Sequence, residues 1–499
     1  MRYGTGNGGV GARRFALAVM AVATLSVACA TRSDTTETTY GSGGGLTEPV
    51  VEYVGSMALE PSNGLPGTTV TVSGQGFTPG QTFDLTWSSA DGSWNIQGDA
   101  GEEYHGRVFT PTVVLLGSVT AGGDGTVAAT FDVPDDFGFS HDVRLVDPEG
   151  VVRNQAAFVV DMQVTISPES GPPGTPITIR VSGLGLEALE GNRQILYDNR
   201  YTGWLSAVTT KGTAVAVIPA TGGPGPHRIE VARGAFTFPY LNPVQSPRPD
   251  ILVYDAVFTI TDGDPVLPPS VDEQIPQPVP RTDFILPESG PWITTDFEVG
   301  AVGSPFVVTG GGVDPGAVVS FTWYRIVGNR VAGQGWEERG IDFGTVTAGS
   351  DGSFEMPTKI PSDVGGMHRL EASVGGSAVA TTSVRITPAA DALPQSVAWG
   401  DAVDLHLTGV GWTETANIYT IVYDNAYLGY ACGFNSQGDV LVPLTATGEP
   451  GWHFIDLYPA IYKGEESGGQ QSFRIPMLTF VEHPGEELPA FHFAFYIEE

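Results

Sequence analysis

The stretch PESGPPGTPITIRVSGLGL, residues 168–186, decides the fold. It opens with a Pro/Gly-rich turn, continues with Ile177, Ile179 and Val181 alternating with other residues, and ends in G-x-G-L. Residues 61–77, PSNGLPGTTVTVSGQGF, repeat this pattern. Because alternation with a period of two residues is typical of a strand with one buried face, both stretches predict the first strands of small β domains.

Two further repeats indicate that the chain is a duplicated pair of modules. YDNRYTG at 197–203 returns as YDNAYLG at 423–429, at an offset of 226 residues. VTAGGDG at 119–125 returns as VTAGSDG at 346–352, at an offset of 227 residues. Self-similarity at a fixed offset indicates repeated structural units. We therefore expect one two-domain unit that occurs twice, in a 2+2 array.

The predicted organisation follows from these repeats and from local composition. Its segments are a signal peptide (1–28), a flexible tether (29–50), module 1 (51–161), module 2 (162–263), a Pro-rich linker (264–281), module 3 (282–387) and module 4 (388–499). PESG at 287–290 is predicted to open module 3, with an insertion at 292–302 behind it. The composition of the linker predicts a semi-rigid polyproline II spacer of up to about 50 Å.

The opening pattern of the modules resembles the IPT/TIG group of immunoglobulin-like domains. The match covers modules 1 and 2 well and the starts of modules 3 and 4 less well. Trp87 and Trp323 stand at equivalent places, where a strand tryptophan anchors the core of an immunoglobulin-like sandwich. The resemblance implies an all-β protein of four tandem immunoglobulin-like β-sandwiches, of a kind used outside the cell as spacers, stalks or binding modules.

Composition excludes several classes of function. Of 499 residues, 41% are hydrophobic and 16% charged, so the chain can build cores and is not a disordered polyampholyte. Lys and Arg number 23 against 56 Asp and Glu, which gives a net charge of −33. Such a protein repels phosphate backbones, so nucleic acid is not expected as a partner.

The N-terminus predicts export. Arg13 and Arg14 precede an uncharged run of 14 residues, 15–28, which is too short to span a bilayer and suits a signal peptide. The run ends in LSVAC, which resembles a bacterial lipobox with Cys29 as the lipidated residue. We therefore expect a lipid anchor on the outer face of a bacterial membrane. The alternative is cleavage at Ala28-Cys29-Ala30, an A-x-A site, and a secreted protein.

One histidine recurs in each module, at His141, His227, His368 and His453. Histidines that recur once per module cannot share one metal ion. Their position resembles that of the residue that closes the E–F corner of an immunoglobulin sandwich, and the resemblance implies that each bonds to backbone there. The sequence leaves open a calcium site at the linker, with the carboxylates of Asp262 and Asp264 as ligands. Cys432 is expected to be a buried thiol. No cofactor and no resident metal are predicted.

Aromatic side chains of the YDNxYxG hairpins are the candidate ligand contacts. They are Tyr197, Tyr201, Trp204, Tyr423, Tyr427 and Tyr430. Exposed aromatics stack on sugar rings, whereas aromatics within strands usually fill the core or cross-strand pairs, and the sequence leaves both readings open.

No nucleophile elbow, metalloprotease motif or paired-carboxylate motif is visible, so we expect no enzyme. The predicted function is a non-catalytic surface lipoprotein that acts as a spacer, adhesin or binder of cell-wall or other polymeric ligands, either polysaccharide or protein. The alternative is a polysaccharide-binding accessory component of a secreted hydrolytic system. A less favoured possibility is an enzyme with its site in residues 88–112. A site on one hairpin should recur on the other, which would raise avidity for a polymer.

Overall fold

The structure, a computed structural model, describes residues 39–40, 51–98, 103–186, 193–235, 238–245, 253–328, 335–462 and 474–498. All of them belong to one compact unit, Thr36–Glu499. The predicted signal peptide and Cys29 lie outside the described residues, as does the tether apart from β1 (Thr39–Tyr40). Among the described residues, no helix has the length and apolar character needed to cross a membrane.

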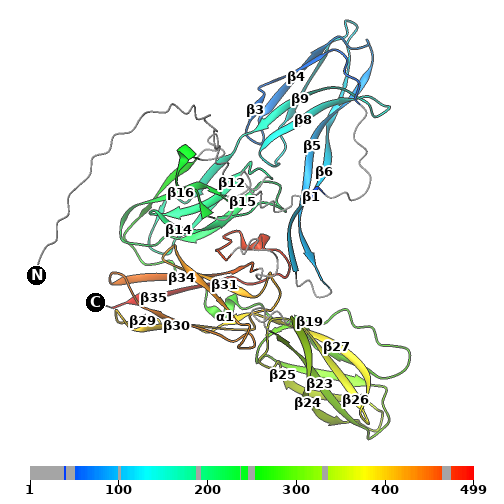
Figure 1. Ribbon diagram of the computed structural model, residues 1–499, viewed down its shortest axis with the longest axis vertical. Coiled ribbons are helices and arrows are strands. Elements are labelled where there is room, and N and C mark those ends of the chain that lie inside the picture. The colour runs from blue at the N-terminus through cyan, green and yellow to red at the C-terminus, as the bar shows by residue number, and fades with distance from the viewer. Residues whose placement is uncertain are drawn as a thin grey trace, which may run out of the picture. The chain divides into compact units, whose positions relative to one another are not determined.

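Nearly every regular element is a β-strand (Figure 1). Module 1 contains β2 (Ser56–Glu60), β3 (Asn63–Gly64), β4 (Thr69–Gln75), β5 (Thr82–Gln97), β6 (Glu103–Thr120), β7 (Val127–Asp132), β8 (Phe139–Val146) and β9 (Val152–Val160). Module 2 contains β10 (Gln163–Ser167), β11 (Ser170–Gly171), β12 (Pro176–Ser182), β13 (Arg193–Tyr197), β14 (Arg200–Leu205), β15 (Ala214–Pro219), β16 (Gly225–Ala235), β17 (Phe238–Pro239), η1 (Pro243–Gln245) and β18 (Tyr254–Ile260).

The second half of the chain repeats this arrangement. The linker contains α1 (Val271–Gln274) and β19 (Val279–Pro280). Module 3 contains β20 (Trp292–Thr295), β21 (Phe297–Ala301), β22 (Pro305–Gly311), β23 (Val318–Gly328), β24 (Trp336–Thr347), β25 (Phe354–Lys359), β26 (Gly366–Val374) and β27 (Ser377–Thr387). Module 4 contains β28 (Ala389–Ala390), β29 (Ser396–Val397), β30 (Ala402–Thr408), β31 (Ile418–Tyr423), β32 (Ala426–Cys432), β33 (Val440–Thr445), β34 (Gly451–Ala460), η3 (Phe480–Glu482) and β35 (Phe491–Ile497).

The same strand order occurs in all four modules. Each has a three-stranded antiparallel sheet, such as β10-β12-β15, and a larger sheet, such as β11-β18-β16-β13-β14. A short strand near the start of each module, such as β11, pairs in parallel with the module's last strand. Two sheets built in this order around one core are immunoglobulin-like β-sandwiches, as the sequence predicts.

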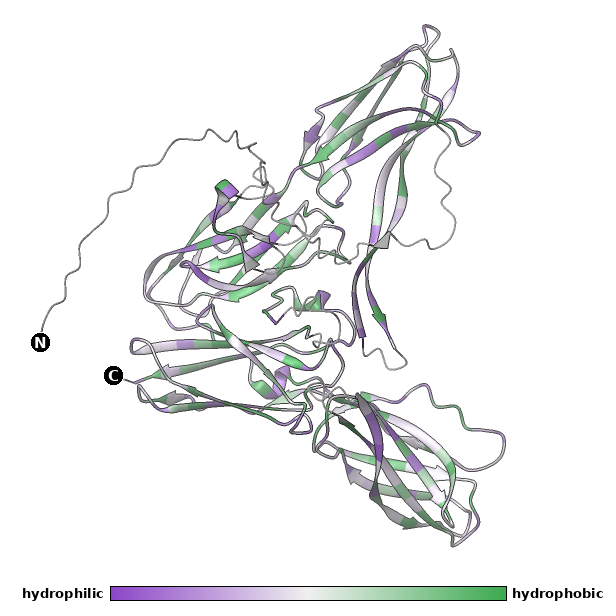
Figure 2. Ribbon diagram, viewed as in Figure 1, coloured by the Kyte–Doolittle hydropathy of each residue, from purple (hydrophilic) through white to green (hydrophobic). Residues whose placement is uncertain are grey.

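The cores follow the alternation in the sequence (Figure 2). Ile177, Ile179 and Val181 of β12 are fully buried against residues of the facing sheet, among them Ile229 and Phe258. Burial of one face in each of two sheets supplies most of the driving force, at about 25 cal/mol per Å² of apolar surface. The predicted alternation is therefore confirmed.

Trp87 and Trp323 occupy the predicted core positions and are also hydrogen-bonded. Trp87 Nε1 donates to Asp136 at 2.9 Å, and Trp323 Nε1 donates to Asp363 at 3.0 Å. Both tryptophans are fully buried. In each case the indole N–H donates a hydrogen bond to a buried carboxylate, whose burial without a hydrogen-bond partner would be energetically unfavourable.

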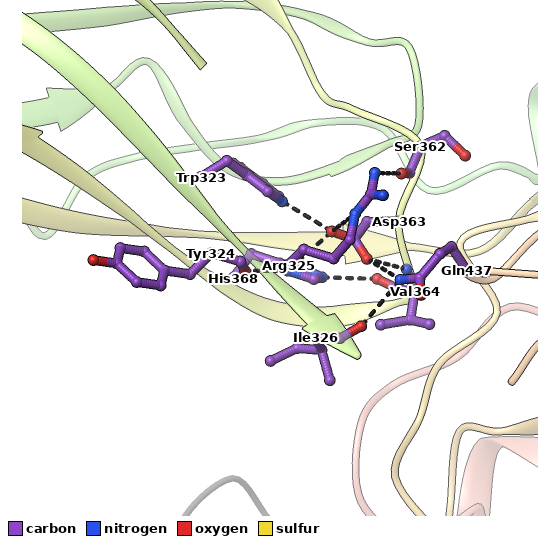
Figure 3. A network of polar contacts seen from close by, with 9 residues as sticks. All are labelled: Trp323, Tyr324, Arg325, Ile326, Ser362, Asp363, Val364, His368 and Gln437. Carbon is purple, nitrogen blue, oxygen red and sulfur yellow. Dashed lines mark hydrogen bonds and ion pairs between the residues drawn. The ribbon is translucent and has the colours of Figure 1, made fainter. Parts of the chain in front are cut away.

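Asp363 also joins module 3 to module 4 (Figure 3). Its Oδ1 accepts a hydrogen bond from Gln437 of module 4 at 2.9 Å, and Gln437 also donates to the Ile326 carbonyl at 3.0 Å. Next along the chain, the Gly365 N–H donates to the Val410 carbonyl at 3.1 Å. The tryptophan-bound corner of module 3 is thus the surface that holds module 4.

The joint between modules 1 and 2 uses residues at equivalent positions. The Gly138 N–H donates to the Leu184 carbonyl at 2.8 Å, as Gly365 does to Val410. Small apolar clusters seal both joints. They contain Phe109, Phe137 and Leu186 in the first joint, and Trp336, Val364 and Trp412 in the second. The duplication therefore extends to the contacts between modules.

Three sequence expectations are corrected by the structure. The predicted insertion at 292–302 holds β20 and β21, so PESG at 287–290 precedes the first strand of module 3. The linker is not a free spacer, because Val271 packs into the core of module 4 and Gln274 hydrogen-bonds the backbone of His492. Cys432, which ends β32, is exposed.

Candidate ligand-binding groove

The YDNxYxG hairpins have the tight turns that their sequences predict. Asp198 and Asn199 join β13 to β14 with φ of 49° and 64°, and Asp424 and Asn425 join β31 to β32 with φ of 47° and 59°. Positive φ at both central residues defines a type I′ turn, in which Asn and Asp are favoured. The turn residues are therefore fixed by backbone geometry before any ligand is considered.

The first tyrosine of each motif hydrogen-bonds the backbone of its own module. Tyr197 Oη donates to the Thr221 carbonyl at 2.9 Å, and Tyr423 Oη donates to the Thr447 carbonyl at 2.7 Å. Tyr197 is only 1% exposed. Burial raises the pKa of Tyr423, so its hydroxyl stays neutral and remains a donor.

The histidines of modules 2 and 4 bind the turn aspartates. His227 Nδ1 lies 2.6 Å from Asp198, and His453 Nδ1 lies 2.6 Å from Asp424. Burial lowers the pKa of His453, but the hydrogen bond from Nδ1 to the Asp424 carboxylate raises it, and the net shift is upward. A His–Asp pair is also a common element of catalytic sites, so the second ring nitrogen matters.

In all four modules the second ring nitrogen is engaged as well. Nε2 of His141, His227, His368 and His453 lies 2.6–2.9 Å from the carbonyl oxygen four residues earlier. In modules 1 and 3, Nδ1 also meets a carbonyl oxygen, and the ring stacks on the core tryptophan. The predicted corner role is confirmed, and neither nitrogen of these rings is free to move a proton or bind a metal.

The remaining candidate aromatics lie where modules 2 and 4 meet. Trp204 is 2% exposed and packs with Ile475 and Met477 of module 4. Tyr201 donates to Gln194 at 2.9 Å and lies edge-on to Tyr427, with ring centroids 6.2 Å apart. Tyr427 in turn donates to the carbonyl of Arg474. Trp204 is therefore buried against protein, whereas Tyr201 and Tyr427 are partly buried.

Among the six candidates, the outcome is therefore mixed. Tyr197 and Trp204 are core residues and are closed to a ligand, because strand aromatics here fill the core and an interface. Tyr430 is 41% exposed, and Arg474 donates to its hydroxyl at 2.8 Å. Tyr423 is the member that lines a groove, as described below.

Asn425, at the turn of the second hairpin, hydrogen-bonds residues of module 2. Its Nδ2 donates to the Pro219 carbonyl at 2.8 Å and to Thr221 Oγ1 at 3.0 Å, while its own carbonyl accepts from Thr202 Oγ1 at 2.7 Å. The side chain is almost fully buried. The hairpins are thus one shared interface and not two separate copies of a site.

A segment of module 4 after β34 pairs with the edge of module 2. The Trp204 N–H donates to the Pro476 carbonyl, and the Leu478 N–H donates to the Trp204 carbonyl, both at 2.9 Å. Glu482 then accepts from the N–H groups of Thr209 and Thr210. These contacts cover β14, which would otherwise expose unpaired backbone groups.

The long β5–β6 hairpin of module 1 reaches the same place. Trp94 Nε1 donates to the Glu482 carbonyl at 2.9 Å, and the Tyr104 N–H donates to Glu414 at 2.7 Å. Residues 88–112, which the sequence leaves open as an enzyme site, thus include contacts to module 4. Among the described residues, no three His, Cys, Asp or Glu side chains gather to hold a metal ion.

Beside the hairpins lies a groove of about 860 Å³. Module 2 contributes Pro173, Arg200 and the Gly222–Pro224 turn, and module 4 contributes the opposite wall. The lining residues of that wall include Tyr423, Leu428, Glu449, Trp452 and His453. The groove therefore combines aromatic surface with one cation and one exposed carboxylate.

Trp452 is a groove residue that the sequence reasoning missed. It lies next to His453, at the place where module 2 has Pro226 before His227. The signal was this departure from the repeat: an aromatic residue in only one of two otherwise matched G-x-H motifs. Trp452 lies against Tyr496 with ring centroids 5.5 Å apart, so its position is held.

No protein-family profile matches this sequence, and no curated protein is similar to it. Among solved structures, Salmonella alpha-2-macroglobulin reacted with methylamine matches 89% of this chain at 12% identity and a TM-score of 0.19, and the chain spans 31% of its length. The ICAM-5 D1–D4 ectodomain fragment matches 85% of this chain and 99% of its own at 12% identity and a TM-score of 0.17. The Yersinia pseudotuberculosis adhesin InvE matches 63% of this chain and 72% of its own at 14% identity and a TM-score of 0.18. At these TM-scores the fold assignment rests on the strand order described above.

Proposed function

We propose that this protein is a non-catalytic binding module of the outer cell surface, which holds an extended polymeric ligand in the groove between modules 2 and 4. The observation that carries the proposal is the groove itself, with Tyr423 and Trp452 on one wall. Aromatic rings offer apolar faces to sugar rings and polar edges to their hydroxyl groups. A polysaccharide is therefore the favoured ligand.

The chemistry of the groove argues against a hydrolase. The His453–Asp424 pair lies in its wall, but His453 Nε2 is taken by the Glu449 carbonyl at 2.9 Å. A general base must be within hydrogen-bond reach of its substrate and must have a nitrogen free to accept the proton. A pair that is fully engaged within the protein supports a structural role.

The site is shared by the two halves and does not occur twice. Arg200 comes from module 2 and Trp452 from module 4, so neither half alone supplies both walls. The avidity expected from two equal hairpin sites is replaced by one groove with a composite lining. Half-proteins should therefore bind the ligand far more weakly than the whole chain.

A direct test is binding of the full chain to cell-wall and glycan preparations. Trp452→Ala should weaken binding at least tenfold because it removes one aromatic face of the groove. Trp399→Ala is the matched control, since Trp399 is a 67%-exposed tryptophan of the same module that does not line the groove. Equal losses for both variants, or none for either, would remove the groove from the proposal.

The surface location rests on Cys29 as a lipid anchor, which is part of this proposal. The unaltered mature protein should partition into the detergent phase because of its lipid anchor, and Cys29→Ser should block lipoprotein processing. A mature N-terminus at Thr31 in the unaltered protein, found by mass spectrometry, would instead support cleavage and secretion.

A further inference from the structure

A second cavity, of about 320 Å³, shares no lining residue with the groove. Module 2, the linker and module 4 all contribute to it. Its walls are apolar and include Val217, Leu267, Phe454, Phe480 and Phe493. The two polar side chains in its lining are Asp456 and His492.

His492 is held in a fixed orientation at this cavity. Its Nδ1 lies 2.7 Å from Asp456 Oδ1, and the Asp456 side chain is 4% exposed. Gln274 of α1 makes two hydrogen bonds to the backbone of His492. Its Oε1 accepts from the His492 N–H at 2.7 Å, and its Nε2 donates to the His492 carbonyl at 2.8 Å. Among the described residues, Nε2 of His492 has no hydrogen-bond partner. The arrangement therefore presents one oriented polar atom beside an apolar space.

The size of the cavity sets the size of its ligand. A cavity of about 150 Å³ lined by apolar side chains holds one benzene molecule. A space of about twice that volume suits a molecule of about ten non-hydrogen atoms, such as an aromatic ring with a short alkyl chain. Ligand pockets of similar character combine apolar walls with a few oriented polar groups.

The charge of the site sets the chemistry of its ligand. Asp456 and a protein net charge of −33 disfavour an anion. A hydroxyl group both donates and accepts, so it suits Nε2 in either protonation state of the ring. We propose that this cavity is a binding site for a small, uncharged, apolar molecule that carries one hydroxyl group, of the phenol or alcohol class, with His492 Nε2 as its polar contact.

The test uses the full chain and two matched probes in calorimetric titrations. The first probe is 4-propylphenol, and the second is propylbenzene, which has the same apolar body and neither a hydrogen-bond donor nor an acceptor. The proposal expects saturable binding of 4-propylphenol with one site per chain, and binding of propylbenzene at least tenfold weaker. Equal affinity for the two probes would overturn the role of His492, and no saturable binding of either would overturn the site.

Two pairs of variants locate the site. Val217→Trp should fill the cavity and abolish binding, while Val215→Trp should leave it unchanged, because both valines are exposed on β15 and only Val217 lines the cavity. His492→Gln should weaken the binding of 4-propylphenol at least tenfold and leave the binding of propylbenzene unchanged. Thermal unfolding of each variant shows that it is folded. Undiminished binding to folded Val217→Trp would place the probe elsewhere and refute the proposal.

Discussion

Gly365 lies so close to Gly409 that a Cβ atom on Gly365 would come within 2.1 Å of the Gly409 carbonyl oxygen. Gly138 and Gly183 repeat this contact in the first half of the chain, at 1.9 Å. The G-x-G segments at 183–185 and 409–411 are therefore places where backbones of consecutive modules meet. Glycine is required at positions 138 and 365 because no side chain fits there.

This contact predicts the effect of one methyl group at the joint. Gly365→Ala should lower the free energy of unfolding by about 1–3 kcal/mol, because the backbones of modules 3 and 4 must move apart. Gly123→Ala should be nearly neutral, since a Cβ atom there meets nothing within 4 Å. Chemical unfolding of the two variants side by side measures the difference, and equal stability would contradict the close joint.

The second prediction concerns the interface between the halves. Asn425→Asp keeps a residue that tolerates positive φ but replaces the amide donor that faces Pro219 and Thr221 with an acceptor. We expect a loss of about 1–3 kcal/mol in unfolding free energy. Asn199→Asp is the matched change at the exposed turn of module 2 and should have little effect. Thermal unfolding decides between them, and two equal melting temperatures would count against this interface.

The third prediction concerns the corner histidines. His453→Ala removes hydrogen bonds to Asp424 and to the Glu449 carbonyl and should cost about 1–3 kcal/mol. His105→Ala, which loses only a surface contact with Glu103, should change stability by less than about 0.5 kcal/mol. Metal analysis of the two variants should give the same metal content per chain. Zinc present in the parent and lost from His453→Ala would refute the structural role.

The fourth prediction concerns the dependence of stability on pH. Burial lowers the pKa of His483 to about 4, although its Nε2 donates to the Thr415 carbonyl. Between this value and an unfolded pKa of about 6.5, the unfolded chain binds more protons, so stability falls as the pH falls from 6.5 towards 4. The contribution is up to about 3 kcal/mol at the acid end.

The upward pKa shift of His453 acts in the opposite direction. Its contribution is full below the unfolded pKa and is lost as the pH rises through the folded pKa. The test is therefore a difference: His483→Gln should flatten the acid limb of the stability curve relative to the parent protein. Two parallel curves between pH 4 and 6.5 would show that His483 does not titrate in this way.

The sequence predicts the local structure well. The alternation at Ile177, Ile179 and Val181 and the YDN turns depend on neighbouring residues, and both patterns are found in the structure. PESG at 287–290 was misleading because the same four residues occur after a strand in module 2 and before one in module 3. A short turn motif fixes a turn and does not say which strand follows it.

The groove and the contacts between halves could not be read from the sequence. Asn199 and Asn425 occupy the same position of the same motif, yet Asn425 is buried against Thr221 and Asn199 is exposed. That difference depends on which faces of modules 2 and 4 meet, and no local pattern encodes it. Trp452 alone carried a signal, as an aromatic residue in one of two matched motifs.

The pairing of β14 with residues 476–478 has a consequence for the order in which the chain matures. The backbone N–H of Ser206, just beyond β14, donates a hydrogen bond to Thr479 Oγ1, which is 273 residues further along the chain. Domains form as units while a polypeptide emerges, so module 2 can form long before its uncovered edge is closed. During that interval the edge is open to other strands, and newly made chains at high local concentration will be most vulnerable to intermolecular pairing at this edge. Pairing with residues 476–478 covers this edge and, by the same hydrogen bonds, helps to join the two halves of the chain.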